Sequence, residues 1–115
     1  MSQLQRRHEQ RQEQRRLGNA ASLALTIALG KDEKLRAKIG PDKGQEKLAA
    51  LKPEAQGVSE SYLEAAGLYL ESLKVMEASE RENNLAAGRP VIAVKRRVEE
   101  ILDRVDQLKN GKLAR

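Results

Sequence analysis

The residue types that perform catalysis are sparse in this chain, and none of them stands in a catalytic pattern. The chain has no cysteine and a single histidine, His8, which lies among glutamine, arginine and glutamate residues. A serine nucleophile needs a neighbouring base, and a zinc site needs several nitrogen or sulfur ligands, so one histidine supplies neither. We therefore expect His8 to be an ordinary member of a polar segment.

Carboxylates are the other side chains that could hold a metal ion or move a proton. The chain has two sets of carboxylates whose spacing places each set on one face of a helix. The first set is Glu60, Glu64 and Glu71, and the second is Glu99, Asp103 and Asp106. Helical carboxylate metal sites combine glutamate with a histidine three residues later, and this chain contains no such pair. Residues 40–44 lack the length and the preceding strand of a phosphate-binding loop. We predict a protein that is not an enzyme, with no cofactor, no metal site and no small-molecule substrate.

The composition indicates helices around a thin aliphatic core. The 115 residues are the length of one domain, 34% of them are charged, and Tyr62 and Tyr69 are the only aromatic residues. Association with another chain would supply burial that one such chain lacks. No apolar run reaches the ~20 residues of a membrane span. The absence of cysteine fits a reducing compartment, so we expect a cytoplasmic protein that does not bind membranes.

The first sixteen residues differ from the rest of the chain. They consist almost entirely of glutamine, arginine and glutamate, with Leu4 as the one apolar side chain after Met1. Arg7, Arg11 and Arg15 recur every four residues and form one basic stripe if the segment is helical. We predict a basic helical or frayed arm over residues 1–16, followed by a single helical bundle domain over 17–115.

Residues 17–29 are apolar on almost every side of a helix. Leu23 and Ile27 belong to this segment, and its few polar residues share one narrow face. Such a helix is expected inside a bundle. Gly30 is placed where a left-handed residue would end it, with a short charged continuation to Ile39.

Proline and glycine predict the connections that follow. Gly40-Pro41 indicates a turn, a weaker helical piece carries Leu48 and Leu51, and residues 53–57 indicate a second connector. The next long helix is expected to start near Ser59 or Ser61, where Ser61 and Glu64 have the spacing of a capping box. It is expected to stop before Gly88.

The last helix carries the most regular pattern in the chain. Pro90 favours a helix start, and aliphatic residues then recur at alternating spacings of three and four, with Ile92 and Leu102 broadening the stripe. This seam consists of Val91, Val94, Val98, Ile101, Val105 and Leu108. The spacing fits packing within one chain or between chains, and does not choose between them.

The fold class predicted from these patterns is all-α, a helical bundle or coiled-coil-like hairpin with an N-terminal basic arm, assembled as a homo-oligomer. The function predicted is a non-catalytic interaction module, a small subunit or adaptor that associates with itself or with another protein. Leu23, Ile27 and the six seam residues are the predicted helix–helix interface.

The charge layout supports an alternative function. The net charge is +5, and residues 53–88 hold seven glutamates against Lys74 and Arg81, so the positive charge lies on either side of this segment. A basic face releases counterions from phosphates, which would make the protein an accessory of a nucleoprotein complex without sequence specificity. Equally, the acidic helix could neutralise the basic ones, or the arm could simply be an exposed helix. The candidate phosphate contacts are Arg6, Arg7, Arg11, Arg15, Arg16, Lys95, Arg96 and Arg97.

Overall fold

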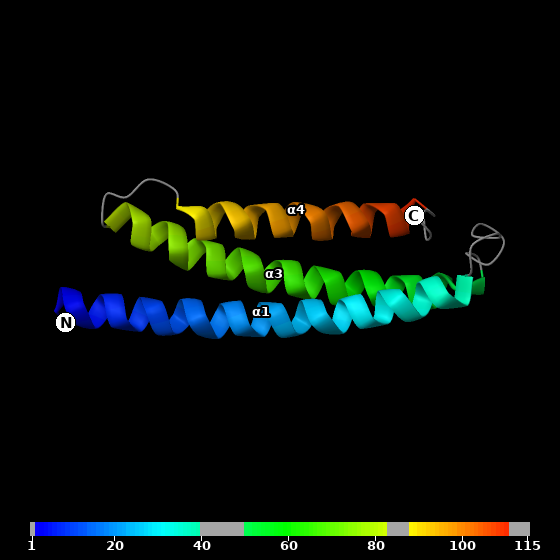
Figure 1. Cartoon of the computed structure of the whole chain (residues 1–115), viewed down its shortest axis with the longest axis horizontal. Coiled ribbons are helices and arrows are strands. Elements are labelled where there is room, and N and C mark those ends of the chain that lie inside the picture. The colour runs from blue at the N-terminus through cyan, green and yellow to red at the C-terminus, as the bar shows by residue number, and fades with distance from the viewer. Residues whose placement is uncertain (1, 40–49, 83–87, 111–115) are drawn as a thin grey trace.

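The computed structural model describes residues 2–39, 50–82 and 88–110 and consists of three long helices (Figure 1). They are α1 (Gln3–Ile39), α3 (Lys52–Glu82) and α4 (Arg89–Lys109). No strand occurs in these residues, which confirms the all-α helical bundle prediction. The predicted turn at Gly40-Pro41, the residue Leu48 and the predicted helix end near residues 85–87 lie outside the described residues.

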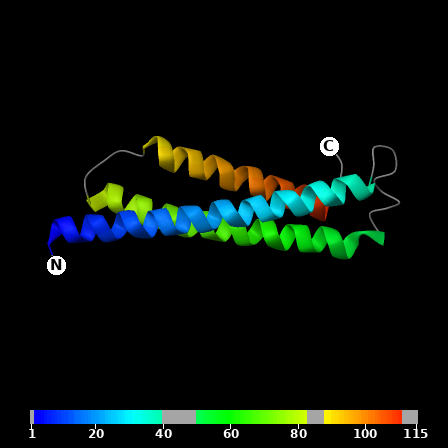
Figure 2. The same ribbon diagram turned by 60° about the horizontal axis from the view of Figure 1, so that its bottom comes forward.

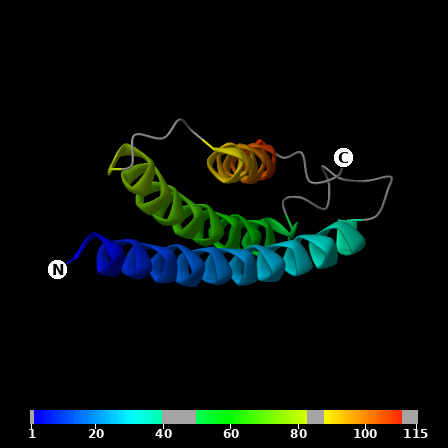
Figure 3. The same ribbon diagram turned by 60° about the vertical axis from the view of Figure 1, so that its left-hand side comes forward.

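The three helices form an elongated bundle in which α3 lies in the middle. The bundle measures 60 × 21 × 16 Å. Within the described residues α1 and α4 each pack on α3, and their backbones do not pack on each other. Both run opposite to α3 and therefore parallel to one another (Figures 1 and 2). Figure 3, in which α4 is seen nearly end-on, shows that α1 and α4 lie on different sides of α3.

α1 is a single helix because one face of it stays buried along most of its length. Leu17, Ala21, Ala28, Leu35 and Ile39 are each at most 3% exposed, and their spacings of four and seven residues follow one side of the helix. The helix passes through Gly30, so the predicted stop there is wrong. A glycine inside a helix lowers stability by about 1 kcal/mol relative to alanine. Burial of Leu35 or of Ile39, which follow Gly30, each contributes more than this.

α3 begins earlier than predicted, and the connector expected over residues 53–57 is part of the helix. Pro53 stands in the first turn, where its missing amide has no partner to lose. Ala55 and Val58 are buried, so this first turn already packs against the bundle. Ser61 is not a helix cap. Ser61 lies inside the helix and is 8% exposed, and its hydroxyl accepts a hydrogen bond of 2.8 Å from the Lys31 ammonium.

Small side chains dominate the contact between α1 and α3. Ala21, Ala28 and Ala65 have no exposed surface, and Ala66 has almost none. The two helices can therefore approach closely. The core is filled by aliphatic residues together with Tyr62 and Tyr69.

α4 starts where the sequence predicted, after Gly88 and with Pro90 in its first turn. Its seam packs against α3 within the same chain. Five seam residues are buried, and Val94 packs partly buried against the core. The two residues expected to broaden the seam do not, because Ile92 is 51% exposed and Leu102 is 44% exposed.

Candidate functional site

A buried ion pair joins the first helix to the last. Arg104 of α4 donates two hydrogen bonds to Asp32 of α1, from Nε to Oδ2 at 2.8 Å and from Nη2 to Oδ1 at 2.7 Å. The side chains are 8% and 3% exposed, respectively. This two-point geometry matches the planar guanidinium to the carboxylate and fixes how far α4 can shift along α1. The third guanidinium nitrogen, Nη1, donates to the amide oxygen of Gln107 at 3.3 Å.

The middle helix contributes to the same cluster through Tyr62. Its buried hydroxyl donates a 2.6 Å hydrogen bond to Oδ2 of Asp32. Burial raises the pKa of Tyr62 well above 10, and the bond to the negative Asp32 raises it further. Asp32 therefore receives donors from two other helices, so this one carboxylate connects all three.

The pKa of Asp32 reflects two opposing effects. Burial alone would raise the pKa of this carboxyl, because it disfavours the charged form. The hydrogen bonds from Arg104 and Tyr62, together with the positive charges of Arg104 and Arg36, outweigh burial and leave the pKa below its ordinary value of 3.8. Asp32 is accordingly an ionised carboxylate at neutral pH.

Arg36 adds a second positive charge to a cluster that holds one negative charge. Its Nη2 lies 3.4 Å from Oδ2 of Asp32, an oxygen that already accepts from Arg104 and Tyr62. The Nε of Arg36 is buried and has no hydrogen-bond partner among the described residues. The cluster thus keeps one net positive charge and one unsatisfied donor.

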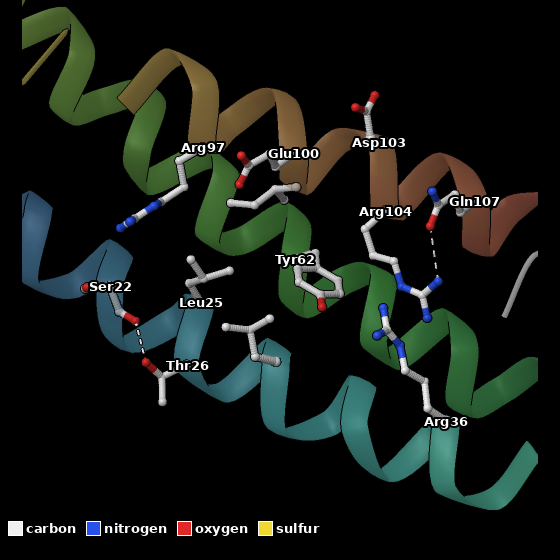
Figure 4. A pocket seen from close by; sticks show the side chains of 12 residues that line it. Ser22, Leu25, Thr26, Arg36, Tyr62, Arg97, Glu100, Asp103, Arg104 and Gln107 are labelled. Atoms are coloured by element: carbon white, nitrogen blue, oxygen red, sulfur yellow. Dashed lines mark hydrogen bonds between the residues drawn. The ribbon is translucent and has the colours of Figure 1, made fainter. Parts of the chain in front are cut away.

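This cluster forms one end of an open groove between α1 and α4, with a volume of about 700 Å³. Ser22, Leu25, Thr26 and Leu29 line it from α1. Figure 4 shows Arg36, Tyr62 and Arg104 pointing toward one another, with Leu25 further along the groove beside Arg97 and Glu100. The α4 wall consists of Arg97, Glu100, Ile101, Asp103, Arg104 and Gln107.

The structure places the predicted phosphate-contacting residues on exposed surfaces of two helices. Residues 3–16 continue α1 without a break, and the side chains of Arg6, Arg7, Arg11, Arg15 and Arg16 are exposed. Some have partners within the fold, since Arg16 pairs with Glu13 at 3.1 Å through Nε. The Glu13 hydrogen bond raises the pKa of Arg16, and its reciprocal effect lowers the pKa of Glu13.

The three basic residues predicted on α4 are also exposed, but they point in different directions. Lys95 lies 3.6 Å from the Glu77 carboxylate of α3. Arg97 lines the groove, donates to the Tyr69 hydroxyl at 3.2 Å and lies 5.7 Å from the centre of that ring. Arg96 does not line the groove. The α4 cluster is therefore not one patch.

The arm and the groove share one side of α1. Arg11 precedes Leu29 by eighteen residues, which is five full helical turns, and Arg15 precedes Ser22 by seven. Because Ser22 and Leu29 line the groove, the basic stripe of the arm continues the α1 wall beyond the start of α4.

The predicted helix–helix interface divides in two. The six seam residues lie inside the bundle, five of them buried and Val94 partly buried against the core. Leu23 is 63% exposed and Ile27 is 51% exposed, so these two large aliphatic side chains on α1 face solvent.

The buried cluster of Asp32, Tyr62 and Arg104 was not predicted. A signal for it exists in the sequence, since Asp32 falls between Ala28 and Leu35 at the spacing of the buried face of α1. No three histidine, cysteine, aspartate or glutamate side chains come together as a metal site in the part of the chain that the structure describes. None of its helices has an apolar stretch long enough to cross a membrane.

Comparison with known proteins identifies no relative of this chain. No family model, no curated protein and no solved structure matches the chain.

Proposed function

We propose that this protein is a non-catalytic helical assembly module, a small cytoplasmic subunit or adaptor that self-associates through the outer face of α1. The observation that carries the proposal is the exposure of Leu23 and Ile27, at 63% and 51%. They stand four residues apart, so they form one apolar strip on the helix surface.

The location of this strip distinguishes it from scattered surface leucines. The α4 seam packs inside the chain, so few of its side chains remain for a partner. Residues 17–29 instead keep large side chains in solvent on the face of α1 that does not pack on α3. Burial of a leucine or isoleucine contributes roughly 1.5–3 kcal/mol, so the strip could hold two chains together. The absence of cysteine suits a reducing compartment.

The test replaces the strip with charge. In the double variant Leu23→Glu and Ile27→Glu, two carboxylates would have to be buried at the interface, while glutamate remains a good helix former. Sedimentation equilibrium should show that the variant dissociates at concentrations at which the unmodified protein is associated. Its circular dichroism spectrum should stay helical.

Leu4→Glu is the matched control, because Leu4 lies on the same helix outside the strip and is 77% exposed. This control should associate like the unmodified protein. Equal association of all three proteins would remove the strip from the interface.

The alternative function is contact with nucleic-acid phosphates. It is favoured by the regular spacing of the arginine side chains along the helical arm. As part of one helix, Arg11 and Arg15 are held about 6 Å apart along the axis. Such a row could follow a phosphate backbone without reading bases.

Salt dependence tests this alternative. Binding of a random DNA duplex should weaken steeply with salt, and the double variant Arg11→Gln and Arg15→Gln should reduce the slope of log K against log [salt] by roughly 2. Lys34→Gln with Lys109→Gln removes the same charge elsewhere and should leave the slope nearly unchanged. An undetectable interaction with the duplex at low salt would eliminate the alternative.

A further inference from the structure

The residues that line the α1–α4 groove suit the binding of an amphipathic helix. Leu25, Leu29 and Ile101 form its apolar lining, and Leu29 remains 48% exposed. The groove lies between α1 and α4, whose backbones do not pack on each other. An amphipathic helix could place its apolar side chains on this lining.

The two ends of the lining carry guanidinium groups. Arg36 belongs to the buried cluster at one end, where two arginines share the single carboxylate of Asp32. A buried N–H without a partner is costly, and the Nε of Arg36 is such a group. A carboxylate from outside the chain would neutralise the excess charge and could accept from the exposed part of the Arg36 side chain, which is 34% exposed.

Arg97 stands at the other end, and its distance from Arg36 follows from the helical register. The ion pair places Arg104 and Asp32 at the same height along the bundle. Arg36 lies four residues after Asp32 on α1. Arg97 lies seven residues before Arg104 on α4. Since the helices run parallel, the two arginines are roughly 16 Å apart along the groove. That separation equals about eleven residues of a helix.

Two acidic residues on the α4 side of the groove favour a peptide partner over nucleic acid. Glu100 and Asp103 line the groove on α4 between the levels of the two arginines. A run of phosphates would be repelled by these carboxylates. A peptide helix can instead place a basic residue there and carboxylates at the arginines.

We infer that the α1–α4 groove binds an amphipathic helix of another protein that presents two carboxylates about eleven residues apart, one to Arg36 and one to Arg97, with aliphatic side chains between them. This inference rests on the proposed function, because it specifies a partner for the assembly module. The groove is separate from the Leu23–Ile27 strip, so self-association and partner binding use different faces of α1.

A designed helical peptide tests the inference on the full-length protein. The probe is a fluorescent peptide of about eighteen residues, with leucines along one face, two glutamates eleven residues apart beside that face, and one lysine between them. Fluorescence anisotropy should show saturable binding. A peptide with lysines in place of the two glutamates should bind at least about tenfold more weakly, as expected for lost charge-assisted hydrogen bonds.

Variants of the protein locate the bound peptide. Arg97→Gln should weaken binding about tenfold, whereas Arg96→Gln removes the same charge outside the groove and should change it little. Arg36→Gln should weaken binding similarly, and Leu29→Gln provides a second measurement at an exposed lining residue in case Arg36→Gln disturbs the fold. Peptide binding that is equal in Arg97→Gln, Leu29→Gln and the unmodified protein would overturn the inference.

Two further outcomes separate this inference from the proposed function. Failure of the glutamate peptide to bind a protein that still self-associates would overturn the inference alone. Displacement of the bound peptide by a random DNA duplex, with tighter binding of the duplex, would assign the groove to nucleic acid and overturn it as well. Peptide binding to a protein that remains monomeric would uphold the inference and remove self-association.

Discussion

Arg104 and Asp32, 72 residues apart in the sequence, form a buried two-point ion pair that holds α4 at one register on α1. Tyr62 adds a donor from the helix between them. The register of α4 determines which residues face each other across the groove. The pair therefore positions the candidate binding surface, and most of the expected effects of mutation follow from it.

Loss of the Asp32 charge should destabilise the protein strongly. Asp32→Asn leaves the Arg104 guanidinium buried without a counter-charge, and broken buried pairs cost about 3–5 kcal/mol. Chemical denaturation in urea should show this loss in the free energy of unfolding. Asp103→Asn on the exposed side of α4 is the control and should change stability by less than about 0.5 kcal/mol. Equal stability of the two variants would refute a structural role for the pair.

Replacing both partners by apolar residues should be much less harmful than removing one. Asp32→Leu with Arg104→Met removes the cost of desolvating two charges, so its stability should exceed that of Asp32→Asn by at least about 2 kcal/mol. The same urea measurement gives the answer. If the pair serves to fix the register of α4, the double variant should fold and yet bind the glutamate peptide more weakly.

Acid should remove the contribution of Asp32 in a predictable direction. The pKa of this carboxyl is lower in the folded protein than its ordinary value of 3.8. The ion pair therefore stabilises the protein fully above about pH 4, and this stabilisation is lost as the pH falls through the folded-state pKa. The stability difference between the unmodified protein and Asp32→Asn should shrink on going from neutral pH to about pH 2. A constant difference would mean that Asp32 does not titrate with a lowered pKa.

Tyr62 should resist ionisation at high pH. Burial and the hydrogen bond to Asp32 raise its pKa above the ordinary value of 10, so the folded protein keeps the hydroxyl protonated where an unfolded tyrosine would ionise. Folding stability linked to Tyr62 is thus present below about pH 10 and falls as the pH rises further. Absorbance titration of a Tyr69→Phe variant isolates Tyr62. An ordinary titration midpoint near 10 in the folded protein would contradict the buried hydrogen bond.

Gly30 should be replaceable with a gain in stability. A Cβ atom at this position would meet nothing within 4 Å, and the residue lies inside α1. Alanine favours the helix by about 0.5–1 kcal/mol over glycine, so Gly30→Ala should raise the free energy of unfolding by that amount. Urea denaturation measures the change. A loss of stability would indicate that the chain turns at Gly30, as the sequence alone suggested.

The helical class and α4 could be predicted because their signals are local and repeated. The alternating three- and four-residue spacing from Val91 to Leu108 is typical of a helix, and Pro90 favours a start at its first turn. The long helices were harder, since Gly30 and Pro53 are strong local breakers. Burial of Leu35 and Val58 in the folded bundle outweighs those local costs, and a single sequence does not show which chain segment they pack against.

The candidate site was less predictable than the fold for a similar reason. Arg104 and Asp32 look like ordinary surface residues in a chain of which 34% is charged. Their partnership depends on the register of two helices whose backbones each pack on α3 and not on each other. The groove likewise arises from the separation of α1 and α4, which no local spacing specifies. The exposed strip at Leu23 and Ile27 was predicted as an interface, but its partner remains a prediction.

The mass of the unmodified protein in solution tests the assembly proposal most directly. One chain has a mass of 12.8 kDa. Light scattering across a range of micromolar concentrations should give a mass that rises to a multiple of this value, because Leu23 and Ile27 would then be buried between chains. A constant mass of one chain over the whole range would contradict self-association.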